Sequence, residues 1–183
     1  MNTFANTYEL IPNVVILVIA VFSAYTDARY RKILNIVTYP GVLFGFLYHT
    51  LVSLLTHHGL LGFLFALYGF LLGFGFFFLF YWISKGKKMG AGDVKLFSAI
   101  GACMGVHATL VVLVITAMVG LLVSVLLLFP IFYRTIRTGN ISILKAFSYF
   151  PIPYGTVIGI SVFLWFLVRY LGLTGRFYLP FYN

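Results

Sequence analysis

The chain has 183 residues, of which 62% are hydrophobic and only 8% are charged, and its mean hydropathy is +1.08. Soluble globular domains carry about 25% charged residues, so this composition excludes one and predicts a single all-α membrane domain over residues 1–183. The net charge of +9 is then explained by the bilayer, and we expect no nucleic-acid partner.

Apolar runs of about 20 residues, the length that crosses the hydrocarbon core, predict six helices. The N-terminus has no Lys or Arg before Pro12, so we expect the first run to be retained rather than removed as a signal peptide. The fourth run reaches only about 20 Å, so neighbouring helices must shield it or its glycine flanks must extend it. The predicted helices are Leu10–Ala28, Ile36–Leu55, Leu60–Ile83, Asp93–Val106, Ala108–Tyr133 and Pro151–Leu171.

Six crossings place the loops alternately on two sides of the membrane, and the basic residues divide unevenly between the sides. Arg169 and Arg176 fall on one side. The other side is cytoplasmic by the positive-inside rule, so both termini face outward in the plasma membrane, and the loop Lys85 to Lys88 is expected to meet anionic lipid headgroups. The basic residues of the cytoplasmic side are Arg29, Arg31, Lys32, Lys85, Lys87, Lys88, Lys95, Arg134, Arg137 and Lys145.

Acidic residues are rare, since the chain contains only Glu9, Asp27 and Asp93. Asp27 ends the first predicted helix, and Asp93 opens the fourth, so both lie at the cytoplasmic face. Acids beside membrane segments are costly, and most of them face the bundle interior and mark function. The alternative is that both acids are solvated or paired with basic residues among the headgroups.

Two carboxylates that converge on one water can divide the work of hydrolysis. One acts as general base on the water, while the other, protonated, donates a hydrogen bond to the scissile carbonyl. Asp93, at the start of a helix, is the expected charged partner because the backbone amides there favour an anion. Gly90 and Gly92 are consistent with a flexible loop or with close approach of a substrate backbone, and their spacing does not choose between these roles.

Other candidate sites have less support. We expect no metal site and no cofactor, because the histidines lie near the outer face without a carboxylate, and Cys103 is a lone core residue. The same geometry excludes Ser-His catalysis. Three glycines in the third helix, Gly69, Gly73 and Gly75, are expected to permit close helix contact. The histidines are His49, His57, His58 and His107.

The two acidic segments together resemble the type IV prepilin peptidases, the GxGD class of intramembrane aspartyl proteases. The first segment is Asp27-Ala28-Arg29-Tyr30-Arg31-Lys32-Ile33-Leu34-Asn35, and the second is Gly90-Ala91-Gly92-Asp93-Val94-Lys95-Leu96. The later stretch Pro151-Ile152-Pro153-Tyr154-Gly155 is similar to the way the family opens its last helix. The likeness covers nearly the whole chain, because the family's core is itself a six-helix unit.

The resemblance implies that Asp27 and Asp93 are the catalytic pair and that Gly90 and Gly92 are the motif glycines. Arg29, Asn35 and Lys95 match further motif positions and are candidates for substrate binding. It also implies a substrate, a prepilin or pilin-like precursor whose short basic leader is cut after a glycine at the cytoplasmic face.

The sequence departs from the family pattern at two places. Leu34 stands where the family often has proline, a change that a loop tolerates. The chain also lacks the paired-cysteine cytoplasmic domain of the larger members, which methylate the new N-terminus. It is therefore similar to the short, peptidase-only branch that serves tight-adherence pili or archaeal preflagellins, and we expect no methyltransferase activity.

Two readings compete with a peptidase. In a small proton-coupled transporter, Asp27 and Asp93 would relay protons, and the short fourth helix would be a broken one. Transport carboxylates are expected near the bilayer midplane, whereas these two lie at helix ends. A structural membrane subunit would tolerate replacement of both aspartates.

Overall fold

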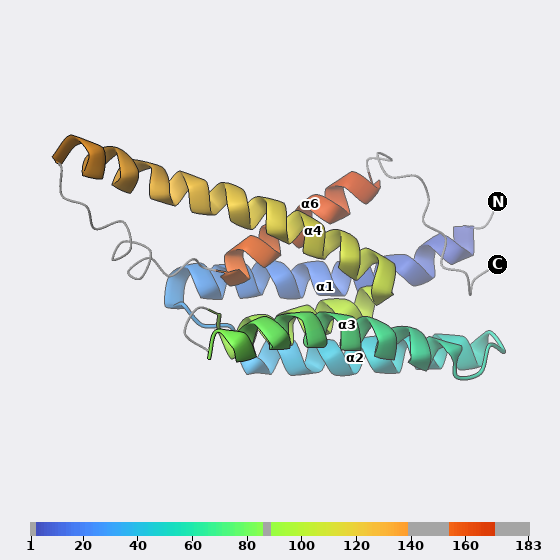
Figure 1. The fold of residues 1–183 in the computed structure, drawn as a ribbon. Helices are drawn as coiled ribbons and strands as arrows, with labels where there is room; N and C mark the ends of the chain where they lie inside the picture. Colours follow the sequence, from blue (N-terminus) through green and yellow to red (C-terminus); the bar gives the residue numbers. More distant parts are fainter. Residues whose placement is uncertain (1–2, 86–88, 139–153, 171–183) are drawn as a thin grey trace.

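The structure is a computed structural model that describes residues 3–85, 89–138 and 154–170. These ranges are almost entirely helical, which confirms the all-α class (Figure 1). Four helices contain stretches long and apolar enough to cross a membrane, and the fifth, α6, is apolar but shorter. The helices are α1 Thr3–Tyr30, α2 Asn35–Leu55, α3 Leu61–Ile83, α4 Ala91–Thr138 and α6 Tyr154–Tyr170.

Some predicted features lie outside the described residues. They include the start of the sixth predicted helix before Tyr154 and most of the basic loop after Lys85. Among the basic residues, Lys87, Lys88, Lys145 and Arg176 are also outside.

The fourth and fifth predicted helices form one element, α4, which bends at Gly105. This residue has φ 71° and ψ −177°, a conformation that a residue with a side chain rarely adopts. The candidate span Ala91–Leu127 has 37 residues and would measure about 55 Å if straight, nearly twice the hydrocarbon core. Instead the chain turns back at the bend, so that α4 has a first arm before Gly105 and a second arm after it (Figure 1).

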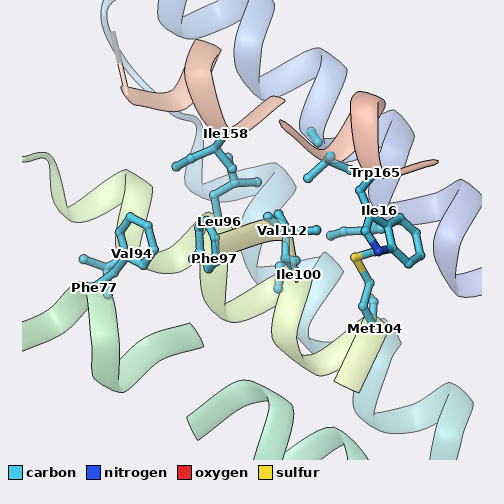
Figure 2. Close-up of a cluster of buried hydrophobic side chains, with 14 of the residues drawn as sticks. Ile16, Phe77, Val94, Leu96, Phe97, Ile100, Met104, Val112, Ile158 and Trp165 are labelled. Atoms are coloured by element: carbon cyan, nitrogen blue, oxygen red, sulfur yellow. The ribbon is translucent and has the colours of Figure 1, made fainter. Parts of the chain in front are cut away.

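The first arm of α4 lies at the centre of the bundle, which explains how so short an apolar segment avoids lipid. Every residue from Leu96 to Gly105 is buried, and Phe97 and Ile100 are fully covered. Figure 2 shows side chains of this arm meeting Ile158 and Trp165 of α6. Shielding by neighbouring helices, one of the two expected solutions, is therefore the one that the fold uses.

Helix α3 packs closely on this first arm through glycines. A Cβ added to Gly69 would lie 2.1 Å from the Gly101 carbonyl oxygen, and one on Gly73 would lie 2.3 Å from the Phe97 carbonyl oxygen. Close contact was expected at these positions and is confirmed. The same expectation for Gly75 is wrong, because nothing lies within 4 Å of a Cβ there.

Helix α1 begins at Thr3, seven residues before the predicted start at Leu10, and continues through Pro12. Proline has no N–H and cannot bond the carbonyl four residues earlier, which belongs to Tyr8. The hydroxyl of Tyr48 on α2 donates a hydrogen bond of 2.9 Å to that carbonyl. The tertiary contact therefore replaces the hydrogen bond that the proline removes.

His49 is buried inside the bundle, with 3% of its surface exposed, rather than lying at the outer interface as expected. Its Nε2 donates a hydrogen bond of 2.8 Å to the carbonyl of Cys103, close to the end of the first arm of α4. Helix ends leave carbonyls without intrahelical partners, so this contact supports the bend at Gly105. Cys103 is buried, as its assignment to the core predicts.

Candidate active site

Asp27 and Asp93 lie at the same end of the bundle. Asp27 belongs to the last turn of α1, and Asp93 belongs to the first turn of α4. Only 8% of Asp27 and 6% of Asp93 is exposed. The structure thus brings together two acids that are far apart in the sequence and removes both from most contact with solvent.

The Gly90-Ala91-Gly92-Asp93 segment closes on itself at the start of α4. The Gly90 N–H donates a hydrogen bond of 3.1 Å to Asp93 Oδ2, and the Asp93 N–H donates one of 3.1 Å to the Gly90 carbonyl. This pairing between the residue before the helix and the third helical residue has the geometry of half of a capping box. The motif spacing therefore fixes the Asp93 carboxylate at the helix N-terminus.

Asp27 is held by a different helix, α6. The Thr156 N–H donates a hydrogen bond of 3.1 Å to Asp27 Oδ2, and the Thr156 hydroxyl donates one of 3.3 Å to the Ala24 carbonyl. Amides in the first turn of a helix have no intrahelical acceptor, so a carboxylate is a favourable partner there. Sequence reasoning missed this partner, and the only signal was the Tyr154-Gly155 pair that opens the helix.

The space between the two acid-bearing segments is filled by Ile33, from the loop that joins α1 to α2. A Cβ on Gly92 would lie 2.8 Å from Ile33 Cβ, and one on Gly155 would lie 2.8 Å from Ile33 Cδ1. The Gly155 position is also 3.0 Å from Cγ of Asp27. A Cβ at either position would therefore force a neighbour to shift, and this packing of Gly92 against Ile33 is a role that the sequence did not predict.

The two carboxyl groups are near enough to interact electrostatically, and the phenol of Tyr154 interacts with Asp93 in the same way. Tyr154 is the first residue of α6, directly before the glycine that contacts Asp27. The first turn of α6 therefore contributes to the surroundings of both acids. Two buried carboxyl groups that interact can share one proton and serve as acid and base.

In the described part of the chain, the other expected site residues, Lys95, Asn35 and Arg29, form no side-chain hydrogen bond with either aspartate. Lys95 Nζ donates a hydrogen bond of 2.9 Å to Asn35 Oδ1 and lies 4.9 Å from the centre of the Tyr39 ring. These contacts join the start of α4 to the start of α2. Arg29 is exposed on the last turn of α1. Within the ranges that the structure describes, no three His, Cys, Asp or Glu residues are grouped as a metal site.

Comparison with known proteins identifies the family. The model of the type IV leader peptidase family (Peptidase_A24) matches residues 14–125, a range that includes both aspartates and the first arm of α4. Neither the curated proteins nor the solved structures contain a significant match. The match covers more than half of the 183 residues. The chain therefore belongs to the type IV leader peptidases, a family of aspartic prepilin peptidases.

Proposed function

We propose that this protein is a membrane aspartyl endopeptidase that removes the short basic leader of a prepilin-like precursor, after a glycine, at the cytoplasmic face. The observation that carries the proposal is the pair of buried acids at one end of the bundle, each accepting a backbone N–H at the start of a helix. Family membership supports the substrate class.

Asp27 and Asp93 perform the hydrolysis together. The ionised carboxylate takes a proton from a water molecule, whose oxygen attacks the scissile carbonyl carbon, while the protonated carboxyl donates a hydrogen bond to the carbonyl oxygen. The tetrahedral intermediate then breaks at the C–N bond as a proton passes to the leaving amine. Each acid accepts one amide hydrogen bond, so we assign the shared proton to the pair rather than fixing the charge on Asp93.

The chain crosses the membrane six times, with both termini outside. The turn at Gly105 supports two crossings for α4, and the last crossing is assigned to α6, which is apolar but shorter than the four candidate spans. The acid-bearing end also carries Arg29, Lys32 and Lys85, which the positive-inside rule places in the cytoplasm near anionic lipid. In a prepilin-like precursor the short basic leader precedes the apolar helix, so the cleavage site lies at the cytoplasmic face, where that helix begins.

A proton relay is less well supported by the positions of the acids. Transport carboxylates lie near the bilayer midplane, where ions must be passed across the apolar region. Asp27 is in the last turn of α1 and Asp93 in the first turn of α4. Both therefore lie near the end of the bundle rather than at its middle, and a precursor would approach them from the cytoplasmic side.

The test is cleavage of a pilin-like precursor in membranes that contain single variants. Asp27→Asn and Asp93→Asn should each lower the cleavage rate by at least about 10²-fold, because an amide cannot exchange the proton that acid-base catalysis requires. The precursor and the shortened product are separated by gel electrophoresis and quantified over time. Full cleavage by either variant would contradict the mechanism and favour a structural role for the acids.

Glu9 provides the matched control because it is the remaining acid in the chain. It pairs with Arg169 of α6 rather than with the candidate site. Glu9→Gln should therefore keep cleavage within a few-fold of the wild-type rate. If Glu9→Gln lowered the cleavage rate as much as the aspartate variants do, removal of any acid would inactivate the protein. The variants would then give no support for a catalytic pair.

A further inference from the structure

Ile33 is an apolar side chain that contacts both halves of the candidate site. It meets Gly92, the residue directly before Asp93, and it meets Gly155, which lies against Asp27. Its side chain is partly buried and packs on the edge of the hydrophobic core. Part of its surface therefore remains uncovered at the end of the bundle that carries the two acids.

The packing around Ile33 leaves no spare room on its two covered sides. A single methyl group on Gly92 or on Gly155 would come within 2.8 Å of it, closer than real Cβ atoms approach a neighbour. The backbones behind these glycines belong to the first turns of α4 and α6, which also hold the acids. Ile33 is thus held on two sides by the helix turns that carry the acids, which limits how far it can move aside for a bulky substrate group.

Attack by a water held between two carboxyl groups fixes where one substrate side chain must lie. The residue before the scissile bond carries its Cβ only two bonds from the carbonyl carbon, a distance of about 2.5 Å. That Cβ must therefore enter the space next to Asp27 and Asp93. A rigid apolar wall there admits a hydrogen atom more readily than a methyl group, and one methyl can change a rate by about 10–200-fold.

We propose that Ile33 is a specificity-determining residue, whose side chain walls the subsite for the residue before the cleaved bond and thereby selects glycine. The inference rests on the proposed peptidase function. It adds to that function a physical reason for the glycine and assigns it to a residue that takes no part in the proton transfers.

The experiment uses two precursors that differ at one position, with glycine or alanine before the cleavage site. The wild-type protein should cleave the alanine precursor at least about tenfold more slowly. Ile33→Ala should raise the alanine-to-glycine rate ratio by about tenfold while still cleaving the glycine precursor. Ile33→Val, which removes only the Cδ1 methyl facing Gly155, should give a smaller rise and is the variant of choice if Ile33→Ala folds poorly.

Ile33→Leu is the matched control, because it keeps the side-chain volume and should keep the preference for glycine. An unchanged rate ratio in Ile33→Ala and Ile33→Val, with both precursors slowed equally, would overturn the inference and leave Ile33 a packing residue. The proposed function fails separately, if the wild-type protein leaves the glycine precursor intact.

Discussion

At the scale of single residues, the two glycines of the Gly90-Ala91-Gly92-Asp93 motif have different roles. A Cβ on Gly90 would lie 3.4 Å from Asp93 Oδ2, an ordinary contact, and the Gly90 amide would still reach the carboxylate. A Cβ on Gly92 would lie 2.8 Å from Ile33 Cβ, so that either the loop or the start of α4 must shift. Close approach therefore constrains the second glycine and not the first.

We expect Gly90→Ala to retain cleavage within about threefold of wild type, and Gly92→Ala to lose at least about tenfold. The reason is that a displacement of about 1 Å in a catalytic group can cost as much as 10²-fold. Initial cleavage rates in membranes, normalised to protein amount, measure the difference. Equal losses in the two variants would show that the motif glycines act through backbone freedom rather than through space beside Ile33.

The sequence was sufficient to identify the two acids but not most of their partners. Asp27 and Asp93 were singled out because acids are rare in this chain and because both end or begin an apolar run. Thr156 could not be found in the same way, since its contribution is a backbone N–H that every residue type except proline carries. Ile33 was also missed, because an isoleucine in an apolar chain carries no signal of its own.

At the scale of helices, the contact between α3 and the first arm of α4 depends on one face of α3. Gly69 lies on that face, where a Cβ would be 2.1 Å from the Gly101 carbonyl oxygen, whereas Gly75 points into open space. Gly69 and Gly75 are the same residue type on different faces of one helix, so they make a matched pair. The pair separates the effect of packing from the effect of helix propensity.

Gly69→Ala should destabilise the protein by at least about 1–3 kcal/mol, because the extra carbon forces two backbones apart. Gly75→Ala should be neutral or stabilise by up to about 1 kcal/mol, because alanine loses less backbone entropy in a helix. Thermal unfolding of the two variants in the same detergent measures both effects. A lower melting temperature for Gly75→Ala than for Gly69→Ala would show that the two faces of α3 are assigned the wrong way round.

The apolar runs predicted the positions of the helices well, but they predicted some of the helix boundaries less accurately. The starts of α2 and α3 differ from the predicted ones by one residue, and their ends coincide with the predicted ones. The start of α1 was missed because the first residues of the chain are polar and do not belong to the apolar run, whereas the helix extends through them and Tyr48 supplies a hydrogen bond to the Tyr8 carbonyl. The break between the fourth and fifth predicted helices was placed within a residue or two of Gly105, which the structure shows as a bend within one element.

At the scale of the whole molecule, the orientation in the membrane decides whether the acids meet a cytoplasmic substrate. Helix α2 offers the simplest test, because its 21 residues span about 31 Å, close to the thickness of the hydrocarbon core. Lys32 lies just before it, at the end of the bundle that carries the acids, and His58 lies just after it. Both side chains are exposed.

The natural chain is already suited to cysteine labelling, because its single cysteine, Cys103, has only 1% of its surface exposed. An impermeant maleimide applied to intact spheroplasts should label His58→Cys and leave both Lys32→Cys and the wild-type protein unlabelled. Lys32→Cys should react only after the membrane is permeabilised. The reverse pattern would place Asp27 and Asp93 outside, away from the cytoplasmic end of a precursor helix. Both the positive-inside assignment and the proposed cytoplasmic cleavage site would then be wrong.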